Sequence, residues 1–459
     1  MKRSASSKSK FGLIEMLEAR QLMSGTPLSV TQGIVDGGLQ LQVSGGNKSD
    51  NILIAPTRGG LRISNGKWSK KVGNAFNSIV VRGGKGNDRV QIDASITAPA
   101  MIYGGVGDDT LIGGSGDDKL YGQGGTDNLD GENGDDVLVN VGDSKADLAT
   151  GGAGIDTFWT DAAGTEQVSD ASADEIADGA VHRVDSFYGF STVRKGAVRA
   201  NRIALDLNGG DLADPGLDDP TARYANFSSN PLFSGAGPSP DDVDQGYVGD
   251  CWYLSTLSAV ARVNPEAIRQ AVVELGDGTY AVQFAHADGS KAFVRVDGDL
   301  PTASWGGMQY AEFGADNSIW VAIMEKAYAC FRDGGVANYS DLDGGWMSEA
   351  FTDLGYSSTE IWDAADGDEL FDGIARDLAD GKAVTLAINQ PKNNCPCVGS
   401  HAYSVVSIDT DGQGNRTMVL RNPWGIDGAG HDGVNDGYVR VTPLQAFTSY
   451  WGVISGTVN

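Results

Sequence analysis

The stretch that decides the fold reads Gly104-Gly105-Val106-Gly107-Asp108-Asp109-Thr110-Leu111-Ile112 and continues in register as Gly113-Gly114-Ser115-Gly116-Asp117-Asp118-Lys119-Leu120-Tyr121. Further copies of this nine-residue unit begin at Gly122 and Gly131 in the same register, and at Gly83 and Gly151 outside it. A fixed period is typical of stacked architectures in which each repeat is one structural unit. The repeat therefore predicts a solenoid in this part of the chain.

Each kind of position in the repeat has a physical reason. Glycine permits tight turns with unusual backbone dihedral angles. Turn carbonyls and carboxylates together suit Ca²⁺, which takes roughly six to eight oxygen ligands. The apolar eighth positions, which we expect to stack into a thin core, are Leu111, Leu120, Leu129 and Leu138. The aspartates at the sixth and equivalent positions, which we expect to be ligands, are Asp88, Asp109, Asp118, Asp127, Asp136 and Asp156.

The repeat resembles the RTX, or haemolysin-type, calcium-binding nonapeptide. That resemblance implies a parallel β-roll with Ca²⁺ between successive turns. The alternative is a solvated Gly/Asp linker, but copies that keep Leu and Asp at fixed positions in one register favour the roll. Because carboxylates brought close together repel each other, we expect the segment to be disordered in chelator and to order with Ca²⁺.

Composition limits the remaining function classes. Lys and Arg number 34 against 61 Asp and Glu in 459 residues, and the formal net charge of −27 is opposite to what a nucleic-acid partner needs. No apolar run reaches the roughly 18 residues of a membrane span, so a soluble or peripheral protein without a transmembrane segment is expected. Four cysteines are too few for a disulfide scaffold in a chain of this length.

Changes of composition divide the chain into segments. At the N-terminus, Met16–Ser24 resembles the LEPR-XLL motif of large exported bacterial proteins, with a short amphipathic helix as the alternative. We expect an export-associated motif at 1–24, a β-rich segment at 25–82, a calcium-binding β-roll at 83–160, a linker or extension at 161–230 and a catalytic domain at 231–459. The expected fold class is multidomain, with a β-roll followed by an α+β domain.

Three residues of the last segment indicate catalysis. The segment Gln245–Ser255 passes from a Gly-rich loop into an apolar run that predicts a helix starting near Cys251. A thiol at a helix N-terminus favours the nucleophilic thiolate. Of the four histidines, His401 best fits the start of a core strand, and Asn422 follows another strand, where its amide could orient an imidazole. Each residue alone has a structural explanation, but together they predict a Cys-His-Asn set.

From about residue 231 onward the chain resembles the calpain-type cysteine protease core, which is papain-like. The matching strings are Gln245–Trp252, Ser318–Ala329, Gly344-Gly345, His401–Ser404 and Arg421–Gly425. The resemblance implies that Cys251 attacks the scissile carbonyl, that His401 takes the thiol proton and that Asn422 orients His401. It also implies that Gln245 donates to the oxyanion and that Trp424 shields the His401–Asn422 contact from water.

The resemblance further implies a Ca²⁺ site in the protease core. Its ligand positions are occupied by Asp242, Gly237 and, by loose alignment, Glu349, although a solvated acidic loop is an alternative. No EF-hand pattern or obvious C2-like domain follows, which departs from the animal enzymes. The Cys395-Pro396-Cys397 string before His401 allows ordinary thiols, a strained disulfide, a redox switch or a metal clip.

These observations predict a calcium-dependent cysteine endopeptidase that acts on protein or peptide substrates through an acyl-thioester, with Ca²⁺ as cofactor. We expect it to be a bacterial protein that is secreted, periplasmic or associated with the cell surface. The alternative is a calcium-dependent surface adhesin or scaffold with an inactive protease-like domain. Transglutaminase-type acyl transfer is a third hypothesis, but that chemistry normally orients its base with Asp, whereas Asn422 favours the protease.

Overall fold

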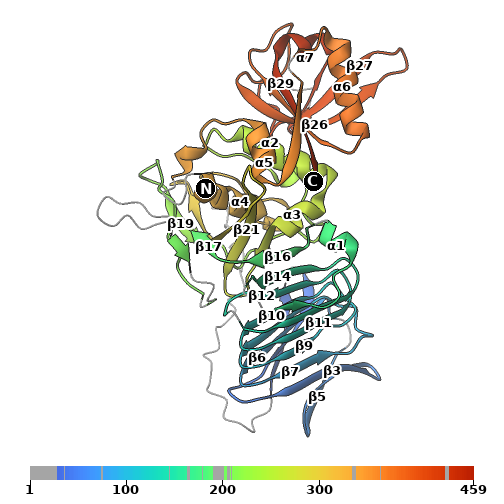
Figure 1. Cartoon of the computed structure of the whole chain (residues 1–459), viewed down its shortest axis with the longest axis vertical. Helices are drawn as coiled ribbons and strands as arrows, with labels where there is room; N and C mark the ends of the chain where they lie inside the picture. Colours follow the sequence, from blue (N-terminus) through green and yellow to red (C-terminus); the bar gives the residue numbers. More distant parts are fainter. Residues whose placement is uncertain are drawn as a thin grey trace, which may run out of the picture.

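A computed structural model describes residues 28–458, except 36, 74–75, 144, 163–165, 178, 190–200, 204–206, 208, 333–337, 362 and 430–433. The N-terminal motif expected at residues 1–24 lies outside the described residues. Along the long axis of the molecule, a β-roll is followed by two lobes of mixed helix and sheet (Figure 1).

Two sheets face each other in the β-roll, and the chain alternates between them from β6 onward. The first sheet contains, in spatial order, β1 (Ser29–Val35), β2 (Gly38–Ser44), β6 (Ser78–Lys85), β8 (Ala100–Val106), β10 (Lys119–Gly124), β12 (Val137–Asn140), β14 (Thr157–Asp161) and β16 (Val181–Val184). The second contains β15 (Gln167–Val168), β13 (Leu148–Ala153), β11 (Asn128–Asn133), β9 (Thr110–Ile112), β7 (Arg89–Ile92), β3 (Asn51–Thr57), β4 (Gly60–Asn65) and β5 (Trp68–Val72). A short helix, α1 (Ala173–Ala177), lies at the last turns (Figure 1).

The predicted leucine core of the roll is confirmed. Parallel pairing places Leu111 opposite Leu129 and Leu120 opposite Leu138, and all four side chains are fully buried. Parallel strands that are buried on one face and stacked at fixed register make a continuous core from short repeats. The nine-residue repeat therefore forms half a turn, and two repeats make one complete turn of the roll.

The sheets extend beyond the compositional boundary expected near residue 83. Leu41 in β2 and Ile54 in β3 belong to the same buried core as Leu120 and Phe158. From β2 and β3 onward the strands already pair in parallel with β6 and β7. The composition changes near residue 83 because the glycine repeat starts there, whereas the sheets start earlier with ordinary alternating strands.

The displaced phase of the first outlying repeat also has a structural cause. Gly84 pairs with Gly105, so that turn contains 21 residues, whereas Leu120 pairs with Leu138 and gives a turn of 18. The three additional residues lie in the loop between β7 and β8. The loop absorbs them, and the ladder of strands continues undisturbed.

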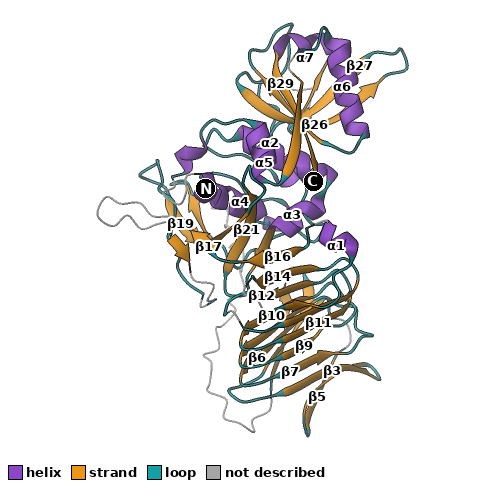
Figure 2. Ribbon diagram, viewed as in Figure 1, coloured by secondary structure: helices purple, strands orange, loops and turns teal. Residues whose placement is uncertain are grey.

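The two lobes after the roll form the α+β domain that the sequence predicts (Figure 2). The first lobe contains β17 (Phe187–Gly189), β18 (Asn201–Ile203), β19 (Arg223–Asn226), η1 (Pro240–Asp242), α2 (Cys251–Val263), α3 (Pro265–Ala271), β20 (Val272–Glu274), β21 (Thr279–Ala285), β22 (Lys291–Asp297), β23 (Asp299–Thr302), η2 (Ala315–Asn317), α4 (Trp320–Arg332), η3 (Tyr339–Leu342) and α5 (Met347–Asp353). The second contains β24 (Tyr356–Ile361), α6 (Gly367–Ala379), β25 (Ala383–Ile388), β26 (His401–Thr410), β27 (Arg416–Arg421), β28 (Tyr438–Val441), α7 (Pro443–Ser449) and β29 (Tyr450–Val458).

The roll and the first lobe share a buried interface, although the sequence indicated a linker or extension at 161–230. β16 completes the first sheet of the roll, and two residues later β17 pairs in parallel with β22 of the lobe. Trp159 and Val184 of the roll lie in one hydrophobic cluster with Leu275 and Phe293 of the lobe. The indole of Trp159 stacks on His182, with ring centroids 4.2 Å apart. The connection is therefore a packed junction.

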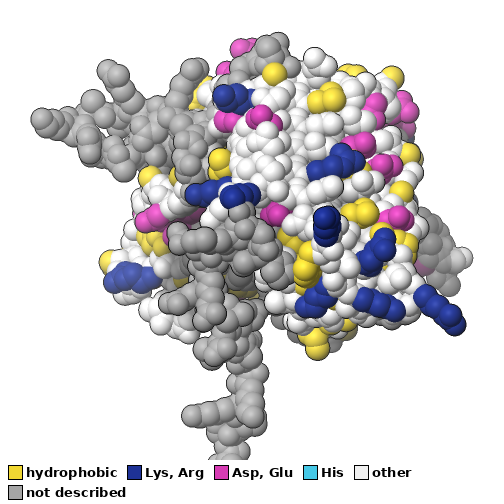
Figure 3. All heavy atoms as spheres, turned by 90° about the horizontal axis from the view of Figure 1, so that it is seen from below, with side chains coloured by type: hydrophobic (Ala, Val, Ile, Leu, Met, Phe, Trp, Pro, Cys, Tyr) yellow, Lys and Arg dark blue, Asp and Glu magenta, His cyan; other side chains and the backbone are white. Residues whose placement is uncertain are grey.

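Charge is distributed unevenly over the roll. The free end, far from the lobes, exposes basic side chains, and Figure 3 shows Lys and Arg side chains prevailing when the molecule is seen from that end. Those on and next to β4 and β5 are Arg58, Arg62, Lys67, Lys70 and Lys71. The acidic residues of the repeats are instead largely buried between turns, as described below. Much of the negative charge of the roll is therefore buried, whereas the basic side chains at its free end are exposed.

Candidate active site and calcium ladders

Cys251 is the first residue of α2, as the sequence predicts. The loop before it is rich in glycine, so the chain can turn sharply into the helix. The Cys251 thiol is partly exposed and feels the positive end of the helix dipole. Burial nevertheless raises the pKa of Cys251 to about 11, against the opposing effect of the Ala402 backbone N–H. In this arrangement the resting group is a thiol.

His401 is the first residue of β26, and it is almost fully buried. Its Nε2 lies 2.8 Å from Oδ1 of Asn422, which follows β27 and is completely buried. Burial lowers the pKa of His401 to about 4, while the Asn422 hydrogen bond opposes that change. A neutral imidazole that donates from Nε2 to Asn422 keeps its lone pair on Nδ1. The ring is therefore prepared to accept a proton on that side.

Trp424 covers the contact between His401 and Asn422. Its ring centroid lies 4.6 Å from that of His401, and its backbone N–H donates to Oδ1 of Asn422 at 3.1 Å. The amide oxygen of Asn422 is thus fixed by two donors. Trp424 thus lies against the His401–Asn422 contact that the resemblance implies it shields from water.

A cleft of about 690 Å³ between the lobes brings the predicted residues together. Cys251, His401, Gln245 and Trp424 all line it. The thiol also lies next to the residue after His401, because the Ala402 backbone N–H points to it. Across the lobes, the Gln245 backbone N–H donates to the Pro423 carbonyl at 2.7 Å. Residues more than a hundred positions apart therefore form one site.

The side chain of Gln245 is engaged locally in this structure. Its Nε2 donates to the Val248 carbonyl at 2.5 Å, and its Oε1 has no hydrogen-bond partner among the described residues. The Nε2 amide carries two hydrogens, so one N–H remains beyond the bond to the Val248 carbonyl, at the wall of the cleft.

A buried pair of carboxyl groups below the nucleophile was not predicted from the sequence. Asp250, directly before Cys251, and Glu325 on α4 contact each other and are almost completely buried. Burial raises the pKa of Asp250 to about 7 and that of Glu325 well above its usual value. Because two carboxylates this close cannot both be charged, the pair holds a shared proton near neutral pH. Only their sequence positions, beside the nucleophile and in an apolar helix, hinted at this.

The predicted calcium ligands form two ladders along the edges of the roll. Within each ladder, the backbone N–H of one acidic residue donates to a carboxylate oxygen of the residue one turn later, at 2.7 to 2.9 Å. One ladder contains Asp50, Asp88, Asp109, Asp127 and Asp147, and the other contains Asp118, Asp136, Asp156 and Glu175. All six predicted aspartates are thus members. Asp50, Asp147 and Glu175 were not among the predicted ligands, because they lie outside the six copies of the repeat that were recognised in the sequence.

The second oxygens of three ladder carboxylates, Asp88, Asp109 and Asp136, fit a cation. A Cβ added at Gly104 would lie 2.4 Å from Asp109 Oδ2 and 2.8 Å from the Gly122 carbonyl oxygen, so two hard donors meet beside this glycine. Oδ2 of Asp109 has no hydrogen-bond partner among the described residues, and neither has Oδ2 of Asp88 or Asp136. Orphaned buried oxygens next to carbonyls are what a Ca²⁺ site with its ion removed requires. The donor set therefore fits calcium.

The Ca²⁺ site implied for the protease core is not assembled by the described contacts. Both oxygens of Asp242 accept N–H groups, including the Trp320 indole at 2.9 Å. Gly237 lies against the guanidinium of Arg269. Glu349 is exposed and forms an ion pair with Arg332 at 3.2 Å. This core site stays a prediction that would need rearrangement of these partners.

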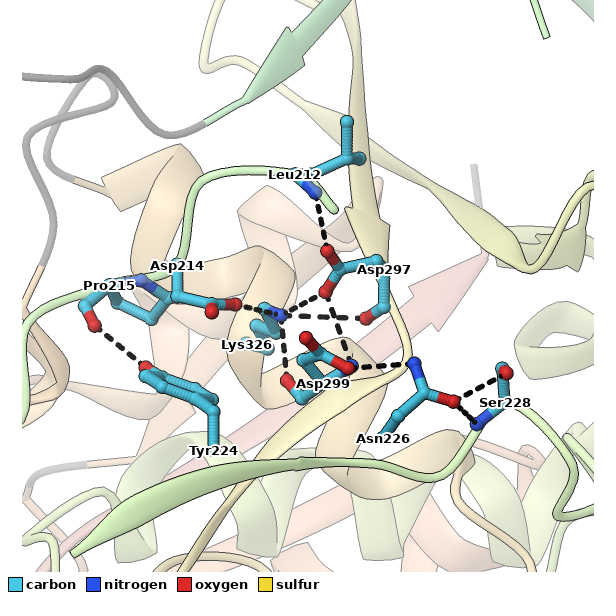
Figure 4. Close-up of polar contacts among 9 residues, drawn as sticks. All are labelled: Leu212, Asp214, Pro215, Tyr224, Asn226, Ser228, Asp297, Asp299 and Lys326. Carbon is cyan, nitrogen blue, oxygen red and sulfur yellow. Dashed lines mark hydrogen bonds and ion pairs between the residues drawn. The ribbon is translucent and has the colours of Figure 1, made fainter. Parts of the chain in front are cut away.

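A different acidic group in the described part of the first lobe has a cation of its own. Oxygens of Asp211, Asp297 and Asp299 lie within 4.8 Å of one another. Figure 4 shows the Lys326 ammonium beside this group, 2.7 Å from Asp297 Oδ1 and 2.6 Å from Asp214 Oδ1. The Lys326 side chain is buried, so it compensates these carboxylates internally. The two ion pairs of Lys326 thus connect Asp214, in the segment before β19, to Asp297 of β22.

All four cysteines are free thiols in the structure. Cys395 and Cys397, both buried, contact each other in the loop before His401. A hydrogen bond from Cys397 lowers the pKa of Cys395 to about 6. The structure thus contains two reduced thiols and no Cys395–Cys397 disulfide.

A thiol at a helix N-terminus and a buried histidine–asparagine pair, on opposite sides of a cleft between two lobes, define a papain-like cysteine protease domain. Comparison with known proteins agrees, since residues 221–433 match the calpain family of cysteine proteases. Residues 103–138 and 141–163 match the RTX calcium-binding nonapeptide repeat. The chain thus combines a calpain-type protease domain with an RTX β-roll, and Ca²⁺ is the cofactor that these repeats bind.

Curated calpain relatives match less than half of this chain. Calpain clp-4 of Caenorhabditis elegans is 32% identical over 237 residues, which cover 47% of this chain and 32% of the relative. The calpain-type cysteine protease DEK1 of Arabidopsis thaliana is 33% identical over 224 residues, 45% of this chain and 10% of the relative. The calpain-1 catalytic subunit of Mus musculus is 31% identical over 224 residues, which cover 44% of this chain and 30% of the relative. The chain therefore spans about a third or less of the length of these relatives.

Within the described ranges, each helix is too short or too polar to cross a bilayer.

Proposed function

We propose that this chain is a calcium-dependent cysteine endopeptidase. The observation that carries the proposal is the meeting of Cys251 with the His401–Asn422 pair in one cleft between the lobes. The similarity of residues 221–433 to calpain-family proteases supports the same reaction class.

In the proposed reaction, the Cys251 sulfur attacks the scissile carbonyl carbon while His401 Nδ1 takes the thiol proton. His401 then gives that proton to the leaving amine, and an acyl-thioester remains on Cys251. Water, deprotonated by His401, hydrolyses the thioester and restores the thiol. Asn422 keeps the imidazole in the orientation and tautomer that this sequence of proton transfers requires.

The developing oxyanion would be stabilised by N–H groups at the start of α2. The Cys251 backbone N–H is one of the donors that a helix N-terminus leaves without an intrahelical partner. The Gln245 side-chain amide would be the second donor, through the N–H that does not bind the Val248 carbonyl. Each such donor is typically worth on the order of 10² to 10³ in rate.

Calcium dependence is proposed to act through the β-roll. Bound Ca²⁺ would neutralise the ladder carboxylates and hold successive turns together. Because the last turns pack on the sheet of the first protease lobe, an ordered roll would also stabilise the lobe that carries Cys251. The roll would thus transmit calcium binding to the catalytic domain without contacting the cleft.

We further propose that the protein acts outside the cytoplasm of a bacterium, as a secreted, periplasmic or surface-associated enzyme. Extracellular calcium modules commonly bind with dissociation constants on the order of 10⁻⁴ to 10⁻³ M, which suits a calcium-rich exterior. Fractionation of cells that express the full chain tests this location, and recovery only in the cytoplasm would reject it.

The direct test of catalysis is covalent labelling of the purified full chain with a thiol-reactive epoxide in saturating Ca²⁺. Labelling should fall on Cys251, as located by peptide mass analysis, and should disappear in Cys251→Ala. Cys330→Ala is the matched control, because Cys330 is buried in the same lobe and should leave the labelling of Cys251 in place. A folded chain that the probe does not label would favour a scaffold or adhesin.

A further inference from the structure

Near the last turns of the roll, the repeat pattern breaks at a position where the structure still gathers oxygen donors. Where earlier turns have the first glycine of a repeat, the next turn has Asn140. Two additional residues then separate it from the following aspartate, since Asp147 stands seven positions after Asn140, whereas Asp127 stands five after Gly122. Asp147 nevertheless occupies the ladder, because its Oδ1 accepts the Asp127 N–H at 2.7 Å.

The Asn140 amide takes the place of a glycine carbonyl. A Cβ added at Gly122 would lie 2.4 Å from Asn140 Oδ1 and 2.6 Å from Asp127 Oδ2. At Gly131, one of the regular turns, the corresponding neighbours are Asp136 Oδ2 and the Gly151 carbonyl oxygen. Side-chain amide and backbone carbonyl oxygens are equivalent ligands for Ca²⁺. The departure from the repeat therefore preserves the donor chemistry.

Asn140 has no other visible role. Its side chain is 4% exposed, yet neither its Oδ1 nor its Nδ2 has a hydrogen-bond partner in the described part of the chain. A buried amide without hydrogen-bond partners destabilises the fold. A buried amide whose oxygen lies beside a carboxylate oxygen would be stabilised by a cation between them.

Negative charge around this position exceeds its nearby compensation. Asp143 accepts the Gly125 N–H at 2.8 Å, and Glu166 accepts the Asp161 N–H at 2.7 Å. Oε1 of Glu166 has no hydrogen-bond partner among the described residues. Carboxylates that are buried close together are costly, and a bound cation would offset that cost.

We propose that Asn140, Asp127 and Asp147, with Asp143 and Glu166 around them, form a calcium site in which the Asn140 amide oxygen replaces the glycine carbonyl of the regular turns. All of its donors are oxygens, which favours a hard cation, and the mixture of carboxylate, amide and carbonyl donors is the one that Ca²⁺ accepts. The proposal is independent of peptidase activity. Its ligand set differs from that of the regular turns by the amide oxygen and by Glu166.

The position of this site connects it to the protease domain. Val139 and Val141, on either side of Asn140, face outward into the cluster that contains Leu275 and Phe293 of the first lobe. Asn140 points the other way, into the roll. An ion held by Asn140 would therefore stabilise the segment of the roll that contacts the lobe.

The experiment is a count of bound Ca²⁺ by native mass spectrometry on the full chain, in a Cys251→Ala background that prevents self-cleavage. Asn140→Leu keeps the side-chain size but removes the ligand, so we expect one Ca²⁺ fewer than in the parent. Asn140→Asp keeps an oxygen and should retain the full count. Asn128→Leu is the matched control, because Asn128 is an exposed asparagine on β11, and its count should equal that of the parent.

A second variant covers the case in which Asn140→Leu fails to fold, as judged by circular dichroism in saturating Ca²⁺. Glu166→Gln changes charge with little change of shape. It should weaken the calorimetric affinity of one Ca²⁺ roughly 10- to 100-fold, as loss of a supporting carboxylate commonly does. A folded Asn140→Leu chain with the full count, or Glu166→Gln with parental affinity at every site, would overturn the proposal.

Discussion

Trp159 of the β-roll and Phe293 of the first protease lobe pack edge to face, with ring centroids 5.8 Å apart. Both rings are buried, and they join β14 of the roll to β22 of the lobe. Next to them, Nδ1 of His182 lies 2.8 Å from Oε1 of Gln283 across the same interface. The roll thus packs directly against the first protease lobe. Ordering or disordering of the roll should therefore affect the lobe through this interface.

Removing the Trp159 ring should weaken the whole chain. We expect Trp159→Ala to lower the free energy of unfolding in Ca²⁺ by about 3–5 kcal/mol, as large-to-small changes of buried aromatic residues do. Chemical denaturation followed by circular dichroism measures this. Trp305→Ala is the control, because Trp305 is 64% exposed and its loss should change stability by less than about 0.5 kcal/mol. Equal effects of the two variants would show that the interface is not a stabilising contact.

The contact between Asn422 and His401 should affect kcat more than KM. Asn422→Ala removes the acceptor that holds the imidazole, and we expect kcat to fall by about 10²-fold, within the range of general-base effects. Steady-state hydrolysis of a peptide substrate provides both constants. Asn415→Ala, in an exposed turn of the same lobe, should leave both unchanged. A parental kcat in folded Asn422→Ala would remove Asn422 from the mechanism.

The pH profile should be broad. Burial lowers the pKa of His401 to about 4 and raises that of Cys251 to about 11. The base must be neutral, so activity should fall as the pH drops through the His401 value. The thiol stays protonated up to its own high pKa, so no alkaline loss is expected before that. We therefore expect kcat/KM to be flat from roughly pH 5 to 9. A bell-shaped profile in which kcat/KM falls on both sides within this pH range would contradict the prediction.

Without calcium, the roll should be more ordered in acid than at neutral pH. Burial, assisted by neighbouring carboxylates, raises the pKa of Asp88 to about 7 and that of Asp136 to about 8, above the usual aspartate value of about 3.8. The folded state therefore binds more protons than the unfolded state between these values, and stability falls as the pH rises through them. Denaturation midpoints in chelator at pH 5 and pH 8 measure this. A higher denaturation midpoint at pH 8 than at pH 5 would contradict this prediction.

The features that could be predicted from the sequence are those in which a local sequence pattern determines where a residue lies in the fold. Leu111 and Asp109 repeat at fixed positions, so their burial and ladder membership follow from the period. Cys251, His401 and Asn422 each begin or follow a recognisable element, and the family resemblance connected them. The early strands lie in the segment that was expected to be β-rich, but their place in the roll, and the loop insertions, were missed because parallel stacking does not depend on the glycine repeat.

The remaining features depend on contacts between distant residues. Asp250 and Glu325 share a proton only because α2 and α4 pack together, and neither position has a pattern that indicates it. Trp159 and His182 lie in sequence that lacks clear periodicity, so their segment was interpreted as the end of the roll and a linker. Asn140 departs from the repeat, and only the position of its amide beside Gly122 shows which group it replaces.

The most direct test of calcium-dependent proteolysis is hydrolysis of an unstructured protein substrate by the purified full chain as a function of free Ca²⁺. Near-ultraviolet circular dichroism of the same samples reports order in the roll, and intact mass reports self-cleavage. We expect no hydrolysis in chelator and a rise that coincides with the ordering transition. Cys251→Ala should order identically without cleaving substrate. Equal rates with and without Ca²⁺, or full activity of Cys251→Ala, would contradict this function.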